Sequence, residues 1–114
     1  MAQQEPNKFS DMKEKAETAV KGIVEEYKKK EECLHYDQSK AADITHKITE
    51  AVIKRLSEMY TTYKFTCTCS ILNKKEGGLH MSSSCYWDSN TDGNILVKDE
   101  NDALYFILNV FALY

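Results

Sequence analysis

Hydrophobic residues in the first half of the chain recur at steps of three and four, which is the spacing of one face of an α-helix. The first such run covers residues 9–27, and Ser10 is its expected N-cap. The second run has either Asp37 or Ser39 as its cap and ends near Met59. The loop between the two runs is short, so we expect an antiparallel pair of helices.

After Met59 the hydrophobic period changes from 3.6 to 2, which is the period of a β-strand. Strands are expected at residues 64–72, 79–88 and 95–98, and a last one at 103–114. Segments rich in Gly, Asn and Asp separate them and are typical of turns. The predicted fold is therefore α+β, with two N-terminal helices packed on a four-stranded antiparallel sheet.

The last predicted strand is apolar on both of its faces. Tyr105, Ile107 and Phe111 alternate with Phe106 and Leu108. Two helices can cover only one face of a sheet, and soluble monomers rarely leave a broad apolar face open to water. We therefore expect a homodimer in which two sheets pack back to back with the helices outside.

The strand expected at residues 79–88 differs from the others because its centre is small and rich in hydroxyl groups. Such a strand builds little core, so its backbone is a good candidate to pair with another chain. The small side chains allow close approach of a ligand backbone, and the aromatic pair at its end can wall pockets. The candidate peptide-binding residues are His80, Met81, Ser82, Ser83, Ser84, Cys85, Tyr86 and Trp87. The candidate dimer-interface residues are Leu79, Cys85, Trp87, Tyr105, Ile107 and Phe111.

Size and charge narrow the function classes. The chain has 114 residues and a formal net charge of −3, which fits one domain with no attraction to nucleic acid or to an anionic membrane. Residues 1–8 read as a disordered tail that lacks the features of a signal peptide, and residues 9–114 as the domain. The four cysteines are expected to be free thiols of a reducing compartment.

The cysteines and histidines raise the alternative of a metal site or a catalytic thiol. Cys85 and His80 would be the natural pair for a zinc site or a Cys–His nucleophile, but an odd separation places them on opposite faces of a strand. Cys67 and Cys69 do not form a C-x-x-C pair. We therefore expect no catalytic residue, no metal and no cofactor, and keep a thiol-dependent enzyme as an alternative hypothesis.

From Tyr36 onward the sequence resembles the Tctex-type dynein light chains. Ser-Ser-Cys-aromatic-Trp-Asp, followed shortly by Thr-Asp-Gly, is a specific feature of that family. The matching segments are Tyr63-Lys64-Phe65, Gly78-Leu79-His80, Ser83-Ser84-Cys85-Tyr86-Trp87-Asp88-Ser89, Thr91-Asp92-Gly93, Glu100-Asn101 and Val110-Phe111-Ala112-Leu113.

The resemblance implies a homodimer in which the strand at residues 79–88 is exchanged between protomers. It also implies a non-catalytic subunit of the dynein motor, whose dimer binds extended segments of the dynein intermediate chain, and of cargo proteins, as added strands. The expected location is the cytoskeleton, in the cytoplasm or in the axoneme of a cilium or flagellum. A heterodimer with a paralogue, and an adaptor dimer of the same fold that works without dynein, remain open.

Overall fold

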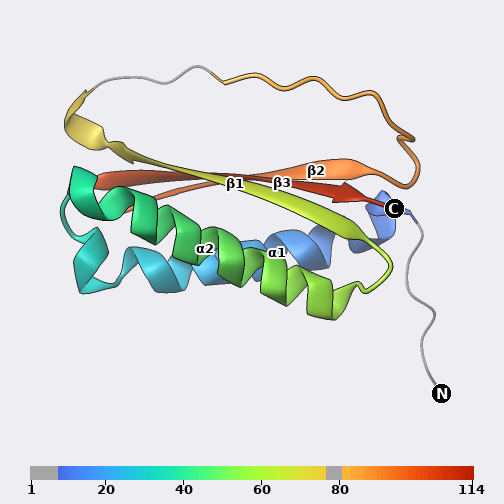
Figure 1. The fold of residues 1–114 in the computed structure, drawn as a ribbon, viewed down its shortest axis with the longest axis horizontal. Helices are drawn as coiled ribbons and strands as arrows, with labels where there is room; N and C mark the ends of the chain where they lie inside the picture. Colours follow the sequence, from blue (N-terminus) through green and yellow to red (C-terminus); the bar gives the residue numbers. More distant parts are fainter. Residues whose placement is uncertain (1–7, 77–80) are drawn as a thin grey trace.

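The computed structural model describes residues 8–76 and 81–114 of the chain. Two helices form one layer, a sheet forms the next, and an extended segment after residue 80 passes on the far side of the sheet (Figure 1). Most of the expected N-terminal tail, at residues 1–7, lies outside the described residues, as do Leu79 and His80 at the start of the expected second strand.

Helix α1 covers Phe9–Lys28 and packs through Met12, Ala16, Val20 and Val24. The prediction of Ser10 as its N-cap was wrong, because the helix begins at Phe9 and no side chain caps it. The backbone N–H of Phe9 instead donates to the carbonyl oxygen of Asn90, at 3.0 Å. A tertiary contact therefore replaces the local cap, which a local sequence pattern does not reveal.

Helix α2 covers Gln38–Met59, and its predicted start is confirmed. The Asp37 carboxylate accepts hydrogen bonds from the backbone N–H of Ser39, at 3.0 Å, and from its hydroxyl, at 2.6 Å. This is an N-cap of the expected kind. A short 3₁₀ helix, η1 (Glu31–Cys33), connects the two helices. Neither α1 nor α2 has a stretch long and apolar enough to cross a membrane.

The sheet of the described residues has three antiparallel strands in the order β1-β3-β2. They are β1 (Lys64–Asn73), β2 (Gly93–Glu100) and β3 (Leu104–Leu113), with a 3₁₀ turn η2 (Lys74–Glu76) after the first. The last strand lies in the centre, which agrees with its apolar character on both faces. The α+β class and the helices on an antiparallel sheet are confirmed.

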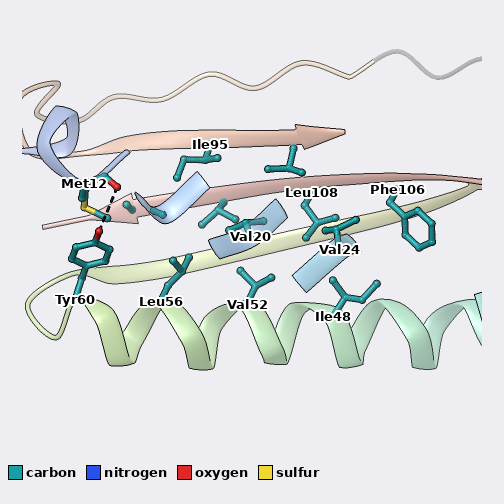
Figure 2. Close-up of a cluster of buried hydrophobic side chains, with 14 of the residues drawn as sticks. Met12, Val20, Val24, Ile48, Val52, Leu56, Tyr60, Ile95, Phe106 and Leu108 are labelled. Carbon is teal, nitrogen blue, oxygen red and sulfur yellow. Dashed lines mark hydrogen bonds between the residues drawn. The ribbon is translucent and has the colours of Figure 1, made fainter. Parts of the chain in front are cut away.

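The core lies between the helices and one face of the sheet (Figure 2). Alternate residues of β3 are at most 1% exposed there, namely Leu104, Phe106, Leu108, Val110 and Ala112. They share one buried cluster with the apolar stripe of α2, namely Ile44, Ile48, Val52 and Leu56. Each large side chain buried in this way stabilises the fold by about 1.5–3 kcal/mol. The packing of the helices on the sheet therefore holds the strands in place, and with them the residues on the opposite face of the sheet.

The expected fourth strand is not part of this sheet. Residues 81–86 are extended and exposed, and they form no ladder with β1, β2 or β3. Within one chain the sheet described is therefore three-stranded. The exchange of residues 79–88 with a second protomer stays a prediction.

Candidate interaction site on the outer face of the sheet

The side of the sheet that points away from the helices is called the outer face. Its residues follow from the strand register and the two-residue pleat. They are Thr66, Thr68, Ser70 and Leu72 of β1, Asn94, Leu96, Lys98 and Glu100 of β2, and Tyr105, Ile107, Asn109, Phe111 and Leu113 of β3. Leu96 is 47% exposed and Tyr105 is 40% exposed, so the face is open over much of its area.

Residues 81–87 are called the arm. All of them except Trp87 are exposed, and Tyr86 projects fully into solvent. No backbone N–H or C=O of the arm is paired with any described part of the chain. An extended stretch with free backbone groups is a template for pairing with another strand.

The arm contacts the outer face through one aromatic pair and is separated from it by a cavity further along. The Trp87 ring packs edge-on against the Phe111 ring, with centroids 6.1 Å apart and planes at 64°. Further along, a cavity of about 350 Å³ separates the arm from the sheet. Its lining comprises Met81, Ser82 and Ser83 of the arm with Asn94, Leu96, Lys98, Ile107 and Asn109 of the outer face. The arm is therefore anchored at its aromatic end and loosely packed at its serine end.

The turn after the arm is held firmly, in contrast to the arm itself. The Asp92 N–H donates to the Asp88 carbonyl oxygen, at 2.8 Å, and the Asp92 carboxylate accepts from the backbone N–H of Asp88, at 3.3 Å. The same carboxylate accepts from the Tyr114 N–H at the end of β3, at 2.7 Å. A Cβ at position 93 would collide with the Phe9 ring, so the close approach of α1 requires glycine there. The turn at residues 88–92, called the hinge, is therefore fixed where the arm ends.

The far end of β2 is tied to the helices by Asn101. Its Nδ2 donates to the carbonyl oxygens of Lys28, at 2.9 Å, and Cys33, at 2.8 Å. Its Oδ1 accepts from the backbone N–H groups of Ala103, at 2.9 Å, and Leu104, at 2.8 Å. One amide side chain therefore joins the end of α1, η1 and the β2–β3 turn.

The structure distributes the predicted site residues unevenly. Trp87 and Phe111 meet, Ile107 shares the cavity with three arm residues, and Tyr105 lies on the same outer face but away from the arm contacts. Cys85 is exposed on the arm. The residues predicted from the sequence did not include Asn94, Lys98 and Asn109, which contribute to this surface. Their outward positions could have been found from the pleat, but their meeting with the arm depends on the fold.

Cys33 of η1 belongs to the core, Cys67 and Cys69 of β1 pack against it, and all three are poorly suited to nucleophilic chemistry. Burial raises the pKa of Cys67 to about 11 and that of Cys69 to about 12. Burial also raises the pKa of Cys33, which has no exposed surface. These thiols are protonated at neutral pH, which is the opposite of an activated cysteine. Among the described residues, no three His, Cys, Asp or Glu side chains converge in a metal-binding arrangement.

The fold and the outer face together define an α+β domain of two helices on an antiparallel sheet, with an arm that pairs with no strand of the described residues. The Tctex-1 family matches residues 11–113, and the chain belongs to that family. The resemblance seen in the sequence is thereby confirmed.

Three relatives illustrate the similarity. A Drosophila melanogaster protein named Dynein light chain Tctex-type is 37% identical over 78 residues, which cover 68% of this chain and 70% of that protein. The Homo sapiens Dynein light chain Tctex-type 3 is 35% identical over 78 residues, covering 68% of this chain and 67% of the human one. A Dynein light chain Tctex-type from Dictyostelium discoideum is 34% identical, with coverage of 68% and 70%.

Proposed function

We propose that this chain is a non-catalytic light chain of a dynein motor. It works as a homodimer that exchanges the strand at residues 79–88 and binds extended segments of the dynein intermediate chain by β-strand addition. The observation that carries the proposal is the arm, whose backbone has no hydrogen-bond partner among residues 8–76 and 81–114 while it lies beside an open sheet face. The names of the relatives support the assignment to dynein.

The exchange has a physical basis in the contrast between hinge and arm. The turn at residues 88–92 is fixed by backbone and carboxylate hydrogen bonds, whereas the arm has one ring contact and a cavity beneath it. Moving the arm to a second copy costs few contacts and gains a ladder of main-chain hydrogen bonds. The same movement uncovers apolar outer-face residues, which the second copy then buries.

Peptide binding follows from the free edge that an exchanged strand presents. Each main-chain hydrogen bond nets about 0.5–1.5 kcal/mol, so one groove binds modestly and accepts varied sequences. The hydroxyl side chains of Ser82, Ser83 and Ser84 leave room for a ligand backbone. A twofold dimer has two such grooves, and a dimeric intermediate chain that occupies both gains roughly 10²–10⁴ in affinity.

The partners that fit this function are the dynein intermediate chain, a second copy of this chain or a paralogue, and cargo proteins with extended segments. The corresponding locations are the cytoplasmic cytoskeleton and the axoneme of a cilium or flagellum. The chain does no chemistry in this role, since it clamps and aligns two disordered segments.

The experiment measures mass and partner binding together. The purified chain is expected to sediment as a dimer and to bind overlapping peptides of a dynein intermediate chain at one peptide per protomer. Ser83→Pro removes a backbone donor from the exchanged strand and should reduce both dimer formation and peptide binding. Ser57→Pro, near the end of α2, is the reference for general destabilisation of the fold. A dimer that binds no intermediate-chain peptide and co-purifies without dynein subunits would favour the dynein-independent adaptor instead.

A further inference from the structure

Asn109 is a buried polar residue at the centre of an otherwise largely apolar strand face. It lies on β3 between Ile107 and Phe111 on the outer face, and it is 9% exposed. Its Oδ1 accepts a hydrogen bond from Nδ2 of Asn94 on the adjacent strand, at 3.1 Å. Asparagine is depleted in β-strands, so strand formation does not explain a buried asparagine in the central strand.

The hydrogen-bonding capacity of the Asn109 amide is only partly used within the described residues. Its Nδ2 donates to none of the described residues, and the side chain lines the cavity beneath the arm. The amide oxygen has a second lone pair besides the one that meets Asn94. Asn109 therefore offers one donor group and one acceptor site to whatever covers the outer face. If only apolar groups covered the outer face, the donor group and the acceptor site of Asn109 would each lack a hydrogen-bond partner and would be cut off from water.

We propose that the Asn109 side chains of two protomers meet next to the twofold axis of the dimer and form reciprocal amide hydrogen bonds that fix its register. This inference rests on the homodimer proposed above. An isologous interface places the same patch on both sides, so a polar group that lies at the twofold axis meets its own copy and must complement it. An amide meets this condition, because it carries a donor and an acceptor, whereas a lone ammonium or carboxylate repels its own copy.

The arm position agrees with this assignment. In the single chain, Ser82 and Ser83 lie over the same cavity as Asn109, and their poor packing leaves about 350 Å³ empty. When the arm leaves for the partner, Asn109 becomes accessible at the moment when the outer face is uncovered. Ile107 and Phe111 then supply apolar contact on either side of the amide pair. A single buried Asn that selects register and partner number has a precedent in coiled coils.

The test is a charge exchange at one position in the full chain. Asn109→Asp and Asn109→Lys should each weaken self-association by about 100-fold or more, because like charges would meet at the axis. Co-expression of the two variants should restore association to within about 10-fold of the wild type, with a one-to-one heterodimer dominating the native mass spectrum. Thr18→Asp and Thr18→Lys on the exposed side of α1 are the matched control and should change neither quantity.

The outcomes separate this inference from the dimer itself. A wild-type chain that stays monomeric would refute the homodimer on which the inference rests. A wild-type dimer that both charged variants leave intact, or a mixture with no excess of heterodimer, would overturn only the Asn109 pairing. If the charged variants fail to fold alone, Asn109→Ala gives the answer, since it should fold and weaken dimerisation about 10-fold. If Asn109→Ala dimerises like the wild type but no longer binds intermediate-chain peptides, Asn109 contacts the peptide. That result would overturn the proposed pairing with Asn109 of a second copy.

Discussion

The carboxylate of Asp92 accepts a hydrogen bond from the backbone N–H of Tyr114, at 2.7 Å, and so joins the hinge of the arm to the end of the central strand. The same carboxylate also accepts from the N–H of Asp88, across the turn. One side chain thereby holds its own turn and the end of the chain, although Asp92 and Tyr114 are 22 residues apart in sequence. The Thr-Asp-Gly motif consequently has a structural role, since its Asp fixes the turn and its Gly admits the Phe9 ring.

Asp92→Ala should lower the free energy of unfolding by about 1–2 kcal/mol, because two backbone N–H groups lose a charged acceptor. Urea unfolding followed by circular dichroism measures this change. Hydrogen exchange should speed up first at Asp88 and Tyr114. Asp102→Ala is the control, since Asp102 is exposed in a turn, and it should stay within about 0.5 kcal/mol of the wild type. Equal effects of the two substitutions would contradict the role of Asp92 as the hinge acceptor.

Asn101→Ala should be more costly than most surface substitutions. The side chain makes four hydrogen bonds to backbone groups of Lys28, Cys33, Ala103 and Leu104, and alanine leaves all four groups without this partner. We expect a loss of about 2–4 kcal/mol in unfolding free energy, measured by urea or thermal denaturation.

The same substitution elsewhere provides a matched control for Asn101. Among the described residues Asn73 makes a single side-chain hydrogen bond to the backbone, in which its Oδ1 accepts from the Lys75 N–H at 3.0 Å. Asn73→Ala should therefore cost less than about 1 kcal/mol. A small effect at Asn101, comparable to that at Asn73, would show that water replaces the four bonds and that this tether contributes little.

The sequence predicts the elements that depend on a local pattern. It does not predict contacts between residues that are far apart along the chain. Both helices follow from their hydrophobic period, and the start of α2 follows from the Asp37 cap. Strand β1 follows from its alternating pattern, and β3 follows from a run of residues that is apolar on both faces. Strand β2 extends over Gly93–Glu100, beyond the predicted 95–98, because pairing with β3 recruits residues of low strand propensity at both ends.

The candidate site was predictable to a similar degree. The serines of the arm predict a segment that contributes little core, and in the described part of the chain the arm indeed pairs with no strand. The Asn94–Asn109 pair and the Asn101 tether were not foreseen, because each joins residues that only the folded sheet and helices bring together. Motif matching identified Asn101 as part of a family pattern without giving the physical reason for it.

Cysteine reactivity offers a test of the two-layer arrangement. Burial raises the pKa of Cys67 to about 11 and of Cys69 to about 12, whereas Cys85 is exposed on the arm. At pH 7.5 an alkylating agent should therefore modify Cys85 at least about 10-fold faster than Cys67 or Cys69, as followed by peptide mass spectrometry. Comparable rates at all three positions in the folded chain would contradict the burial of the β1 thiols.

The same shifts set the direction of an alkaline effect. A thiol whose pKa is raised in the folded state stabilises the fold below the unfolded pKa, here the ordinary value of 9.0, and this contribution is lost as the pH rises toward about 11 or 12. The free energy of unfolding should fall between pH 9 and 11. In Cys67→Ala/Cys69→Ala the fall should be shallower. An identical pH profile in the double variant would assign the alkaline loss to other groups, such as Tyr60 and Tyr63.

Adjacent residues of β3 give the sharpest test of which face is core. Phe106 has no exposed surface and packs against the helices, whereas its neighbour Tyr105 is 40% exposed on the outer face. Phe106→Ala should cost about 3–5 kcal/mol of unfolding free energy, and Phe106→Asp should prevent folding because a lone charge would be buried. Tyr105→Ala should cost less than about 1.5 kcal/mol when measured below the dimerisation range. A larger loss at Tyr105 than at Phe106 under those conditions would invert the assignment of the two faces, and with it the position of the arm and of the Asn109 amide.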